Sequence, residues 1–273
     1  MNHRKISNVK LSKSLKALRL NSLDLGGGGG CLIYCGGVMR LHKITFYTAL
    51  LLTILFFYPN VWAQNKENPE LTKTLAQMDA VSANFSSFEA KFTQKQYVAL
   101  LREYETPETG EFHYTMDKNR AVAMRHEILT PGVRITTIKG DSATVYQPAI
   151  RQAQIYSLGN RRNLVEYLAT GLGQSSDKLR EQFDISYEGT EAVGDEPCSI
   201  LALVPKDKSA AASVKSITIW IKRSTGTPAQ YKFLEPTNNY MLKTFSGEKL
   251  NGKIPADMFE QKLPSGTEIL RLN

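Results

Sequence analysis

The sequence predicts an α+β protein built on one strongly curved antiparallel sheet of about eleven strands, with helices on its concave side. Two observations predict this class. From residue 88 onward apolar and polar residues alternate, so that Phe88, Ala90 and Phe92 share one face of a strand. An amphipathic segment at 69–83 stands directly before this run. A sheet of more than about ten strands must curl or split, which gives the helix a concave apolar face to cover.

Residues 39–63 have the organisation of a secretory signal peptide. A basic start at 39–43 is followed by an apolar run at 44–58 and by the Val61-Trp-Ala63 cleavage motif. The apolar run is shorter than the roughly 20 residues of a membrane span, which disfavours the alternative of a retained N-terminal anchor. Residue 64 is Gln rather than Cys, so no thiol is offered for lipid attachment. We therefore expect a soluble product in the periplasm that begins near Gln64.

Residues 1–38 stand in front of a complete signal peptide, and we interpret them as a mis-set start that is disordered. Gly36-Gly37 just before Met39 would be encoded by a purine-rich tract, which is how a translated ribosome-binding site looks. The glycine run at 26–30 is not a phosphate loop, because no Gly-Lys-Ser/Thr follows it. The remaining residues, 64–273, show no linker or repeat and predict a single domain.

The charge distribution argues against a nucleic-acid partner. Residues 1–63 hold eight of the 34 Lys and Arg residues and one of the 26 Asp and Glu residues, which leaves 26 basic and 25 acidic residues in 64–273. A nearly neutral domain lacks the basic footprint that binds phosphate backbones. Within 64–273 the sequence has one cysteine, Cys198, which cannot form an internal disulfide and is most simply a small buried apolar residue.

Three helices are expected in 64–273. In the first, 69–83, Leu71, Leu75 and Met78 recur at spacings of three and four, which predicts packing on the sheet. Binding to a membrane surface is the weaker alternative, because Lys73 is the cation on the polar face. Two further helices are expected midway through the chain, at 160–171 and at about 175–182.

Turn signals such as Pro131-Gly132 and Gly140-Asp141 divide the rest into strands. The first series is expected at approximately 87–104, 109–116, 120–128, 132–138, 142–147 and 151–157. The second series is expected at roughly 183–190, 197–205, 214–223, 228–235 and 239–247, followed by an extended piece at 267–272.

Catalytic and metal-binding signals are poor, so we expect neither an enzyme nor a cofactor. His113 and His126 fall in separate predicted strands without a Ser, Cys or acidic partner at motif spacing. No cluster of His, Cys and Asp has the spacing of metal ligands. Gly171-Leu-Gly173 follows a predicted helix rather than a strand, so it is not a dinucleotide-binding loop.

Several short motifs follow one another along 64–273. They are Phe92-Thr-Gln94, Gly110-Glu-Phe112, Gly140-Asp141, Tyr146-Gln-Pro148 with Gln152 or Gln154, Leu203-Val-Pro205, Ile217-Thr-Ile219, Ile254-Pro255 with Phe259, and Pro264-Ser-Gly266. Each motif alone is a common string. Their joint order, behind a signal peptide without a cysteine, resembles the periplasmic outer-membrane lipoprotein carrier family (LolA-like).

The resemblance implies an incomplete, half-open antiparallel β-barrel with an α-helical lid. It implies a periplasmic carrier that shields lipoprotein acyl chains and moves them from the inner to the outer membrane. The implied partners are lipoproteins, an inner-membrane release complex and an outer-membrane acceptor, and we expect a monomer. The family's acceptor shares the fold but is lipid-anchored, so the absence of a cysteine after Ala63 favours the soluble carrier.

Acyl chains need a dry cavity, because exposing each CH₂ group to water costs about 0.8 kcal/mol. Strand parity places ten residues on the cavity side of the sheet: Phe88, Phe92, Phe112, Tyr114, Met124, Val133, Ile135, Ile219, Tyr231 and Phe233. The alternative is that these residues fill a solid core. Met124 and Met241 would supply an adaptable lining for chains of varied shape.

The resemblance also implies a basic residue after the Gly-x-Phe strand that couples the lid to the barrel. Arg120 is the best positional match and Arg125 the second, although neither has the proline of the family pattern. We expect Arg120→Leu or Arg125→Leu to fold normally but to bind cargo without releasing it. Two alternative functions are a periplasmic sensor that binds lipids or mislocalised lipoproteins, and a carrier of another amphiphile such as a glycolipid.

Overall fold

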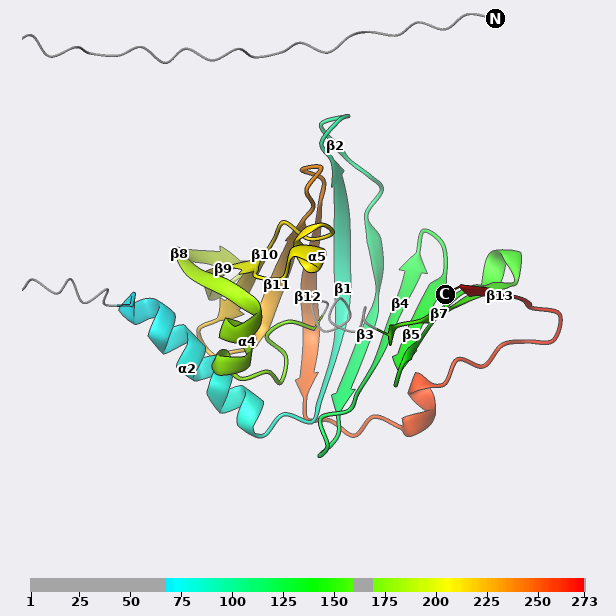
Figure 1. The fold of residues 1–273 in the computed structure, drawn as a ribbon, viewed down its shortest axis with the longest axis horizontal. Coiled ribbons are helices and arrows are strands. Elements are labelled where there is room, and N and C mark those ends of the chain that lie inside the picture. The colour runs from blue at the N-terminus through cyan, green and yellow to red at the C-terminus, as the bar shows by residue number, and fades with distance from the viewer. Residues whose placement is uncertain (1–66, 160–168, 273) are drawn as a thin grey trace, which may run out of the picture. The chain divides into compact units, whose positions relative to one another are not determined.

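The computed structural model describes residues 67–159 and 169–272. The predicted signal peptide and mis-set start lie outside the described residues. The chain divides into two units, Met1–Gln64 and Asn65–Asn273, and every described residue belongs to the second. In that unit 13 strands of the described ranges form one sheet (Figure 1).

The strands follow the predicted ones closely. They are β1 (Ser87–Val98), β2 (Glu103–Tyr104), β3 (Glu108–Met116), β4 (Val122–Thr130), β5 (Arg134–Lys139), β6 (Ser142–Gln147), β7 (Gln152–Ser157), β8 (Phe183–Val193), β9 (Glu196–Pro205), β10 (Ser216–Lys222), β11 (Pro228–Leu234), β12 (Tyr240–Leu250) and β13 (Glu268–Leu272).

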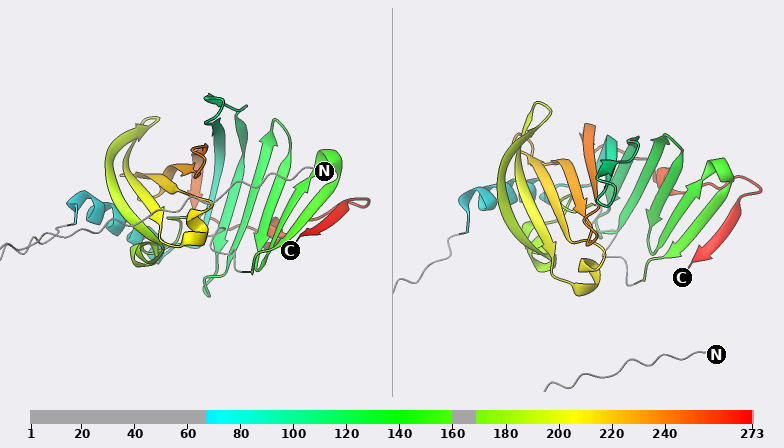
Figure 2. Two further views of the ribbon diagram at one scale, coloured as in Figure 1. Left: turned by 45° about the horizontal axis from the view of Figure 1, so that its top comes forward. Right: turned by 90° about the horizontal axis from the view of Figure 1, so that it is seen from above.

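The order of the strands makes the sheet an open barrel. It runs β13-β7-β6-β5-β4-β3-β1-β12-β11-β10-β9-β8, with β2 paired to β1 outside this path. Neighbours are antiparallel except β13, which lies parallel to β7. Figure 2 shows the sheet curving between its two edge strands, β8 and β13. The predicted half-open barrel is confirmed, with more strands than expected because the 87–104 stretch is split and the last piece joins the sheet.

Alternation of side chains gives the sheet one apolar face. In β1 the side chains of Phe88, Ala90 and Phe92 are buried. They lie beside Tyr114, Phe112 and Gly110 of β3 in the antiparallel register. This face is called the concave face below, and the opposite one the outer face.

Two predicted helices cover part of the concave face. Helix α2 (Pro69–Ala83) begins after Asn68, whose side-chain oxygen accepts the Glu70 N–H at 2.9 Å. Helix α4 (Ser176–Gln182) begins after Ser175, whose hydroxyl accepts the Lys178 N–H. Figure 1 shows both lying across the β8–β11 side of the sheet. Of the helix expected at 160–171, residues 160–168 lie outside the described ranges and 169–171 form a turn.

The C-terminal segment crosses the outer face before it reaches β13. A short 3-10 helix, η3 (Ala256–Phe259), packs on β4 and β5. Leu263 then packs against Ile135, Tyr146 and Ala153. This crossing brings β13 to the free edge of β7, with Glu268 paired to Gln152. Two other short helices, η1 (Pro148–Ile150) and α5 (Lys208–Ala211), connect strands.

The predicted strand 87–104 is interrupted by a protruding turn. Residues 99–102 form the turn, and Arg102 has a positive φ of 58°. The Ala99 N–H donates to the side-chain oxygen of Asn239 at 2.9 Å, which ties the base of the turn to the β11–β12 connection. The chain then returns as β2 along the end of β1.

Candidate functional site

The concave face carries an aromatic cluster at its centre. Phe245 of β12 packs edge to face against Phe88 and Tyr231, with ring centroids 5.4 and 5.7 Å away. It also meets Phe112 at 5.7 Å. Eight of the ten residues predicted for this face are buried on it: Phe88, Phe92, Phe112, Tyr114, Met124, Ile219, Tyr231 and Phe233. The structure therefore brings together most of the residues that strand parity places on this face.

Val133 and Ile135 were placed wrongly by the parity argument. Val133 is 41% exposed and lies in the turn that follows Pro131, because β5 begins one residue later, at Arg134. From that start, Thr136 and Ile138 face the concave side. Ile135 faces the outer side and packs with Tyr146. Its side chain packs against Leu263 of the C-terminal segment and does not line the concave face.

A buried segment fills the concave side over β10 and β11. Ala169, Thr170, Leu172 and Gln174 are each at most 4% exposed. The Tyr231 hydroxyl donates to the Thr170 carbonyl at 2.7 Å, which gives this buried phenol a partner. Burial raises the pKa of Tyr231 further above its ordinary value, so the phenol stays protonated and donates. The set formed by α2, residues 169–174 and α4 is called the lid below.

Polar contacts hold the parts of the lid to one another and to the sheet. The Asp79 carboxylate of α2 accepts the Ser176 N–H and the Ser176 hydroxyl, both at 2.6 Å. The Gln77 amide donates to the Arg223 carbonyl at 3.2 Å. Gly226 has a φ of +74°, and a Cβ there would lie 2.9 Å from the Gln77 carbonyl oxygen. The β10–β11 turn can approach α2 this closely because it has glycine at that position.

Arg120 connects the barrel to the lid. It lies in the β3–β4 turn with a φ of +61°, and its guanidinium donates to the Gly173 carbonyl. The Asp117 side chain shapes this turn, because its Oδ1 accepts the Asn119 and Ala121 N–H groups at 2.8 Å. This contact is of the kind predicted for the coupling residue.

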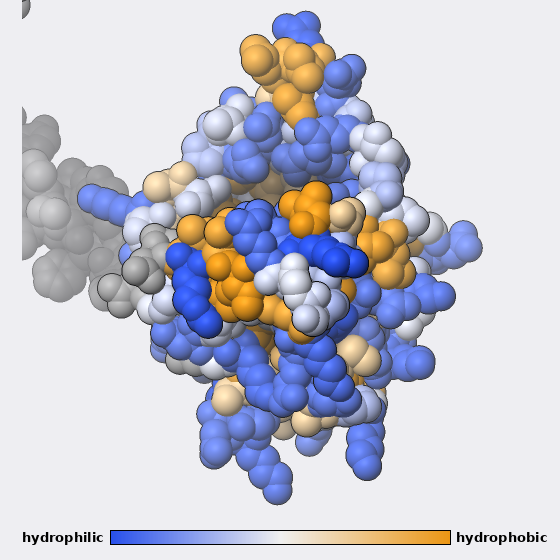
Figure 3. All heavy atoms as spheres, turned by 90° about the vertical axis from the view of Figure 1, so that its right-hand side faces the viewer, coloured by the Kyte–Doolittle hydropathy of each residue, from blue (hydrophilic) through white to orange (hydrophobic). Residues whose placement is uncertain are grey.

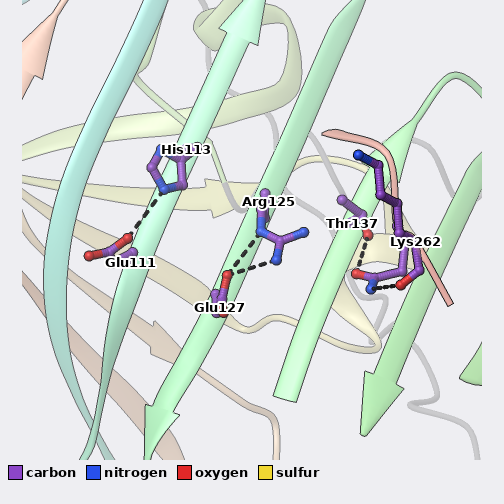
Figure 4. A network of polar contacts seen from close by, with 7 residues as sticks. Glu111, His113, Arg125, Glu127, Thr137 and Lys262 are labelled. Carbon is purple, nitrogen blue, oxygen red and sulfur yellow. Dashed lines mark hydrogen bonds and ion pairs between the residues drawn. The ribbon is translucent and has the colours of Figure 1, made fainter. Parts of the chain in front are cut away.

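Arg125 does not reach the lid, which corrects the second prediction for that role. It lies on the outer face, and its Nε and Nη2 donate to Glu127 Oε2 at 2.9 and 2.8 Å. Figure 4 shows Arg125 beside His113 and Thr137, its register neighbours on β3 and β5. Strand parity is the reason, because an odd-numbered position in β4 faces away from Met124 and His126.

The concave face is not packed solid. A cavity of about 190 Å³ is lined by Gln94, Phe112, Met124, His126, Thr136, Met241 and Lys243. A wider opening of about 500 Å³ shares Gln94 and Met241 with it and is otherwise lined by Gln96, Glu105, Thr106, Glu108, Pro131 and Arg134. The small cavity is below the roughly 300–1,000 Å³ of typical ligand pockets.

A lysine and a histidine meet in the wall of this cavity. Lys243 Nζ lies 2.9 Å from His126 Nε2 and 4.8 Å from the centroid of the Phe92 ring. Burial lowers the pKa of Lys243 to about 7, against a smaller opposing effect of Glu108. Burial, followed by the charges of Lys243 and Arg134, lowers the pKa of His126 well below its ordinary value. His126 is therefore neutral near pH 7 and accepts from Lys243.

Sequence reasoning missed Lys243 and gave His126 no role. The signal was present in β12, where Met241 and Phe245 flank Lys243 at the spacing of one strand face. A lysine between two inward-facing apolar residues is the pattern of a buried charge.

Apolar side chains also gather at a protruding tip of the sheet. Leu100 and Leu101 of the β1–β2 turn are 90% and 62% exposed. This turn stands at the top of Figure 1, and Figure 3 shows an apolar patch at the same end of the molecule. The rings of Tyr97, Tyr104 and Tyr240 pack together below it, and the Tyr104 and Tyr240 hydroxyls lie 2.5 Å apart.

Membrane-spanning helices and clusters of metal ligands are both absent from the described ranges. Among residues 67–159 and 169–272, no helix is long and apolar enough to cross a membrane. Within the same ranges, no group of three or more His, Cys, Asp or Glu side chains is placed to hold a metal ion. Cys198 is buried with a free thiol, and burial raises its pKa.

The family model described as outer membrane lipoprotein carrier protein LolA matches residues 83–262. The chain belongs to this family. Two outer-membrane lipoprotein carrier proteins, from Azotobacter vinelandii and Pseudomonas fluorescens, are 21% and 22% identical to it over 233 residues, 85% of this chain and 100% of each relative. Among solved structures, an uncharacterized conserved protein from Thermus thermophilus is similar, with 12% identity and a TM-score of 0.47 over 74% of this chain and 99% of that one. The predicted resemblance to LolA is confirmed.

Proposed function

We propose that this LolA-family protein is a periplasmic carrier that shields the acyl chains of lipoproteins and moves them from the inner to the outer membrane. The observation that supports this function best is a hollow concave face with aromatic residues in its wall, covered by a lid whose residues 169–174 accept hydrogen bonds from the side chains of Tyr231 and Arg120. We also propose that an inner-membrane release complex loads the protein, that an outer-membrane acceptor unloads it, and that it acts as a monomer.

The energetics favour exchange of the lid for acyl chains. Displacing residues 169–174 breaks the Tyr231–Thr170 and Arg120–Gly173 hydrogen bonds. A hydrogen bond of this kind contributes about 1 kcal/mol net. Burying one acyl chain of about a dozen CH₂ groups contributes up to about 10 kcal/mol, which exceeds that loss. Displacing the lid also exposes buried apolar groups such as Leu172 to water. This cost lowers the net free energy gained when an acyl chain binds, which favours release.

The eight buried residues of the concave face are the proposed acyl-chain contacts. Phe112 and Met124 already line the cavity of about 190 Å³. Tyr231 and Ile219 become accessible once residues 169–174 withdraw, because Gly171 now lies against Ile219 and Thr170 against Tyr231. Met124 and Met241 supply flexible surface for chains of different shape.

Binding of a triacylated lipopeptide to the purified protein tests the proposal directly. The acylated peptide should protect the segments that contain Phe112 and Met124 from labelling, and the same peptide without acyl chains should not. In cells, depletion of the protein should leave lipoproteins at the inner membrane, and fractionation should find the protein in the periplasm. Lipoproteins that reach the outer membrane normally after complete depletion would contradict the carrier role.

A carrier of another amphiphile is the second candidate, and the Lys243–His126 pair favours it. An ammonium group in the wall of a hollow suits a guest with an acidic head group better than a guest held by acyl chains alone. Mass spectrometry of the lipid that copurifies with the protein distinguishes the two functions. A sensor on the same fold would instead require a signalling partner that binds only the lipid-loaded protein.

A further inference from the structure

Lys243 is a buried cation without an acidic partner among the described residues. Its side chain belongs to a residue that is 7% exposed, and no carboxylate of residues 67–159 or 169–272 lies within ion-pair distance of it. It contacts His126 Nε2 at 2.9 Å and the faces of Phe92 and Phe112 at 4.8 and 6.0 Å from their centroids. A buried ammonium is costly unless it is paired, so this arrangement favours a guest that supplies the missing charge.

Gln94 adds a second unsatisfied group beside it. Gln94 is the register partner of Lys243 across β1 and β12, and it is 8% exposed. Its side-chain oxygen accepts no hydrogen bond within the described part of the chain. Its amide nitrogen donates to Glu108, whose carboxylate also meets Arg134 at 3.3 Å. The Glu108 carboxylate therefore pairs with Gln94 and Arg134 at the opening, whereas Lys243 lines the cavity.

The cluster stands at the boundary between a polar opening and an apolar interior. Gln94 lines both the opening of about 500 Å³ and the cavity of about 190 Å³. Phe112 and Met124 both line the cavity, and Phe112 also packs against Phe245 of the aromatic cluster. An amphiphile with its chain among Phe112 and Met124 would place its head group beside Lys243.

We propose that Lys243, His126 and Gln94 form a binding subsite for the acidic head group, a carboxylate or phosphate, of a single-chain amphiphile. Lys243 donates to the anion and balances its charge. His126 holds the lysine side chain in place through the Nζ–Nε2 contact, and Phe112 and Met124 contact the chain. This proposal rests on the proposed function in one respect, that acyl chains enter the same cavity.

Binding at this site should take up protons. The charged or titratable groups around the Lys243–His126 pair are Glu108 from β3, which acts on Lys243, and Arg134 from β5, which acts on His126 of β4. The pKa of Lys243 is about 7 in the empty protein, and an adjacent anion raises it. Affinity for an anion should therefore be constant below about pH 7 and fall by up to tenfold per pH unit above it.

Displacement of a fluorescent fatty acid from the purified protein tests the subsite with three probes that share one chain: laurate, dodecyl phosphate and dodecanol. At about pH 6 we expect at least one anion to bind about tenfold more tightly than the alcohol, and the difference to vanish near pH 9. The stronger anion identifies the head-group class. Equal binding of anions and alcohol at about pH 6, or no binding of any probe, would overturn the proposal.

Lys243→Met removes the charge while keeping the volume, and Lys91→Met removes an exposed lysine of the same sheet as the matched control. We expect Lys243→Met to bind the anions no better than dodecanol, and Lys91→Met to keep the preference. If both variants fold and Lys243→Met still binds the anions more tightly than dodecanol, the subsite is contradicted. Binding of the triacylated lipopeptide to the wild type is measured in parallel. A wild type that prefers the anions but does not bind the lipopeptide contradicts lipoprotein carriage alone, and a wild type that binds the lipopeptide without preferring the anions contradicts the subsite alone.

Discussion

Lys243 places an amino group in the buried wall of a cavity, and the cost of charging it there should be measurable as a pH dependence of stability. Its pKa is about 7 in the folded protein and 10.5 when unperturbed. Between these values the unfolded chain binds a proton that the folded chain does not, so this group makes stability rise with pH. The slope is at most about 1.4 kcal/mol per pH unit.

Lys243→Met should therefore be more stable than the wild type at pH 7, by about 1–3 kcal/mol. The difference should shrink as pH rises from about 7 to about 9. Urea unfolding of both proteins across this range measures it. A difference that stays constant with pH would mean that Lys243 keeps its ordinary pKa in the folded protein.

Arg120 and Arg125 offer a matched pair for the coupling between barrel and lid. Arg120→Leu removes the hydrogen bond to the Gly173 carbonyl, which exists with the lid closed. Losing about 1 kcal/mol from the closed state makes release of cargo roughly fivefold less favourable. Transfer of a labelled lipopeptide to acceptor liposomes should slow in Arg120→Leu.

Arg125→Leu is the control for that experiment, because its ion pair with Glu127 lies on the outer face. We expect it to release cargo as the wild type does. Equal release by both variants would leave Arg120 without a coupling role.

The lid depends on glycines that no other residue can replace without movement. Gly173 has a φ of +67°, and a Cβ there would lie 2.4 Å from the Phe85 ring. Gly194, in the β8–β9 turn, has a φ of +61° and open space around its Cβ position. Both substitutions by alanine carry the backbone penalty of about 1 kcal/mol, but Gly173→Ala adds a clash that pushes residues 169–174 from the sheet.

Gly173→Ala should therefore expose the concave face, whereas Gly194→Ala should lower stability without exposing it. Binding of a dye that fluoresces on apolar surfaces, measured at equal folded fraction, separates the two effects. Equal dye binding by both variants would show that the lid tolerates the added methyl group.

Most strands were predictable because each has one buried face, which fixes its parity. The limits of β6 agree with the expectation at both ends, and α2 follows from its apolar stripe. Parity failed in β5. Val133 precedes this strand, which begins at Arg134, and is exposed. The register with β4 sets Ile135 opposite Glu127, on the outer face, and a sequence pattern does not give that register.

Contacts between distant segments were not predictable from local pattern. Gly110 looked like a common motif residue, yet a Cβ there would lie 1.9 Å from the Glu127 carbonyl oxygen and 2.7 Å from the Phe92 ring. The parallel pairing of β13 depends on the path of residues 251–267 over the outer face, which no periodicity encodes. Lys243 faces His126 across 117 positions of sequence, and strand alternation alone does not reveal such a pair.

The described unit combines a continuous sheet with a lid that lies over part of one face. We expect local opening of the lid to occur without opening of the sheet. Amide hydrogens of β1, β3 and β12 lie in the middle of the strand order and are paired on both sides. In residues 169–174 the carbonyls of Thr170 and Gly173 accept from the side chains of Tyr231 and Arg120, not from the backbone of a strand. Native-state exchange should be slowest in those three strands and much faster in residues 169–174 and α2.

A triacylated lipopeptide should accelerate exchange in residues 169–174 while leaving β1 unchanged, because we propose that the guest takes the place of the lid. Hydrogen exchange read by mass spectrometry, with the unacylated peptide as control, measures this. Protection of residues 169–174 by the lipopeptide would mean that cargo binds elsewhere or beneath a lid that stays shut.

The last strand joins its neighbour late in synthesis. Gln152 of β7 and Glu268 of β13 are 116 positions apart, so the edge of β7 waits for nearly the whole domain to be made. Until β13 arrives, that edge offers unpaired amide and carbonyl groups to any other chain nearby. Refolding in dilute solution should therefore return more monomer than refolding in concentrated solution, because each chain then completes its own edge before it meets another.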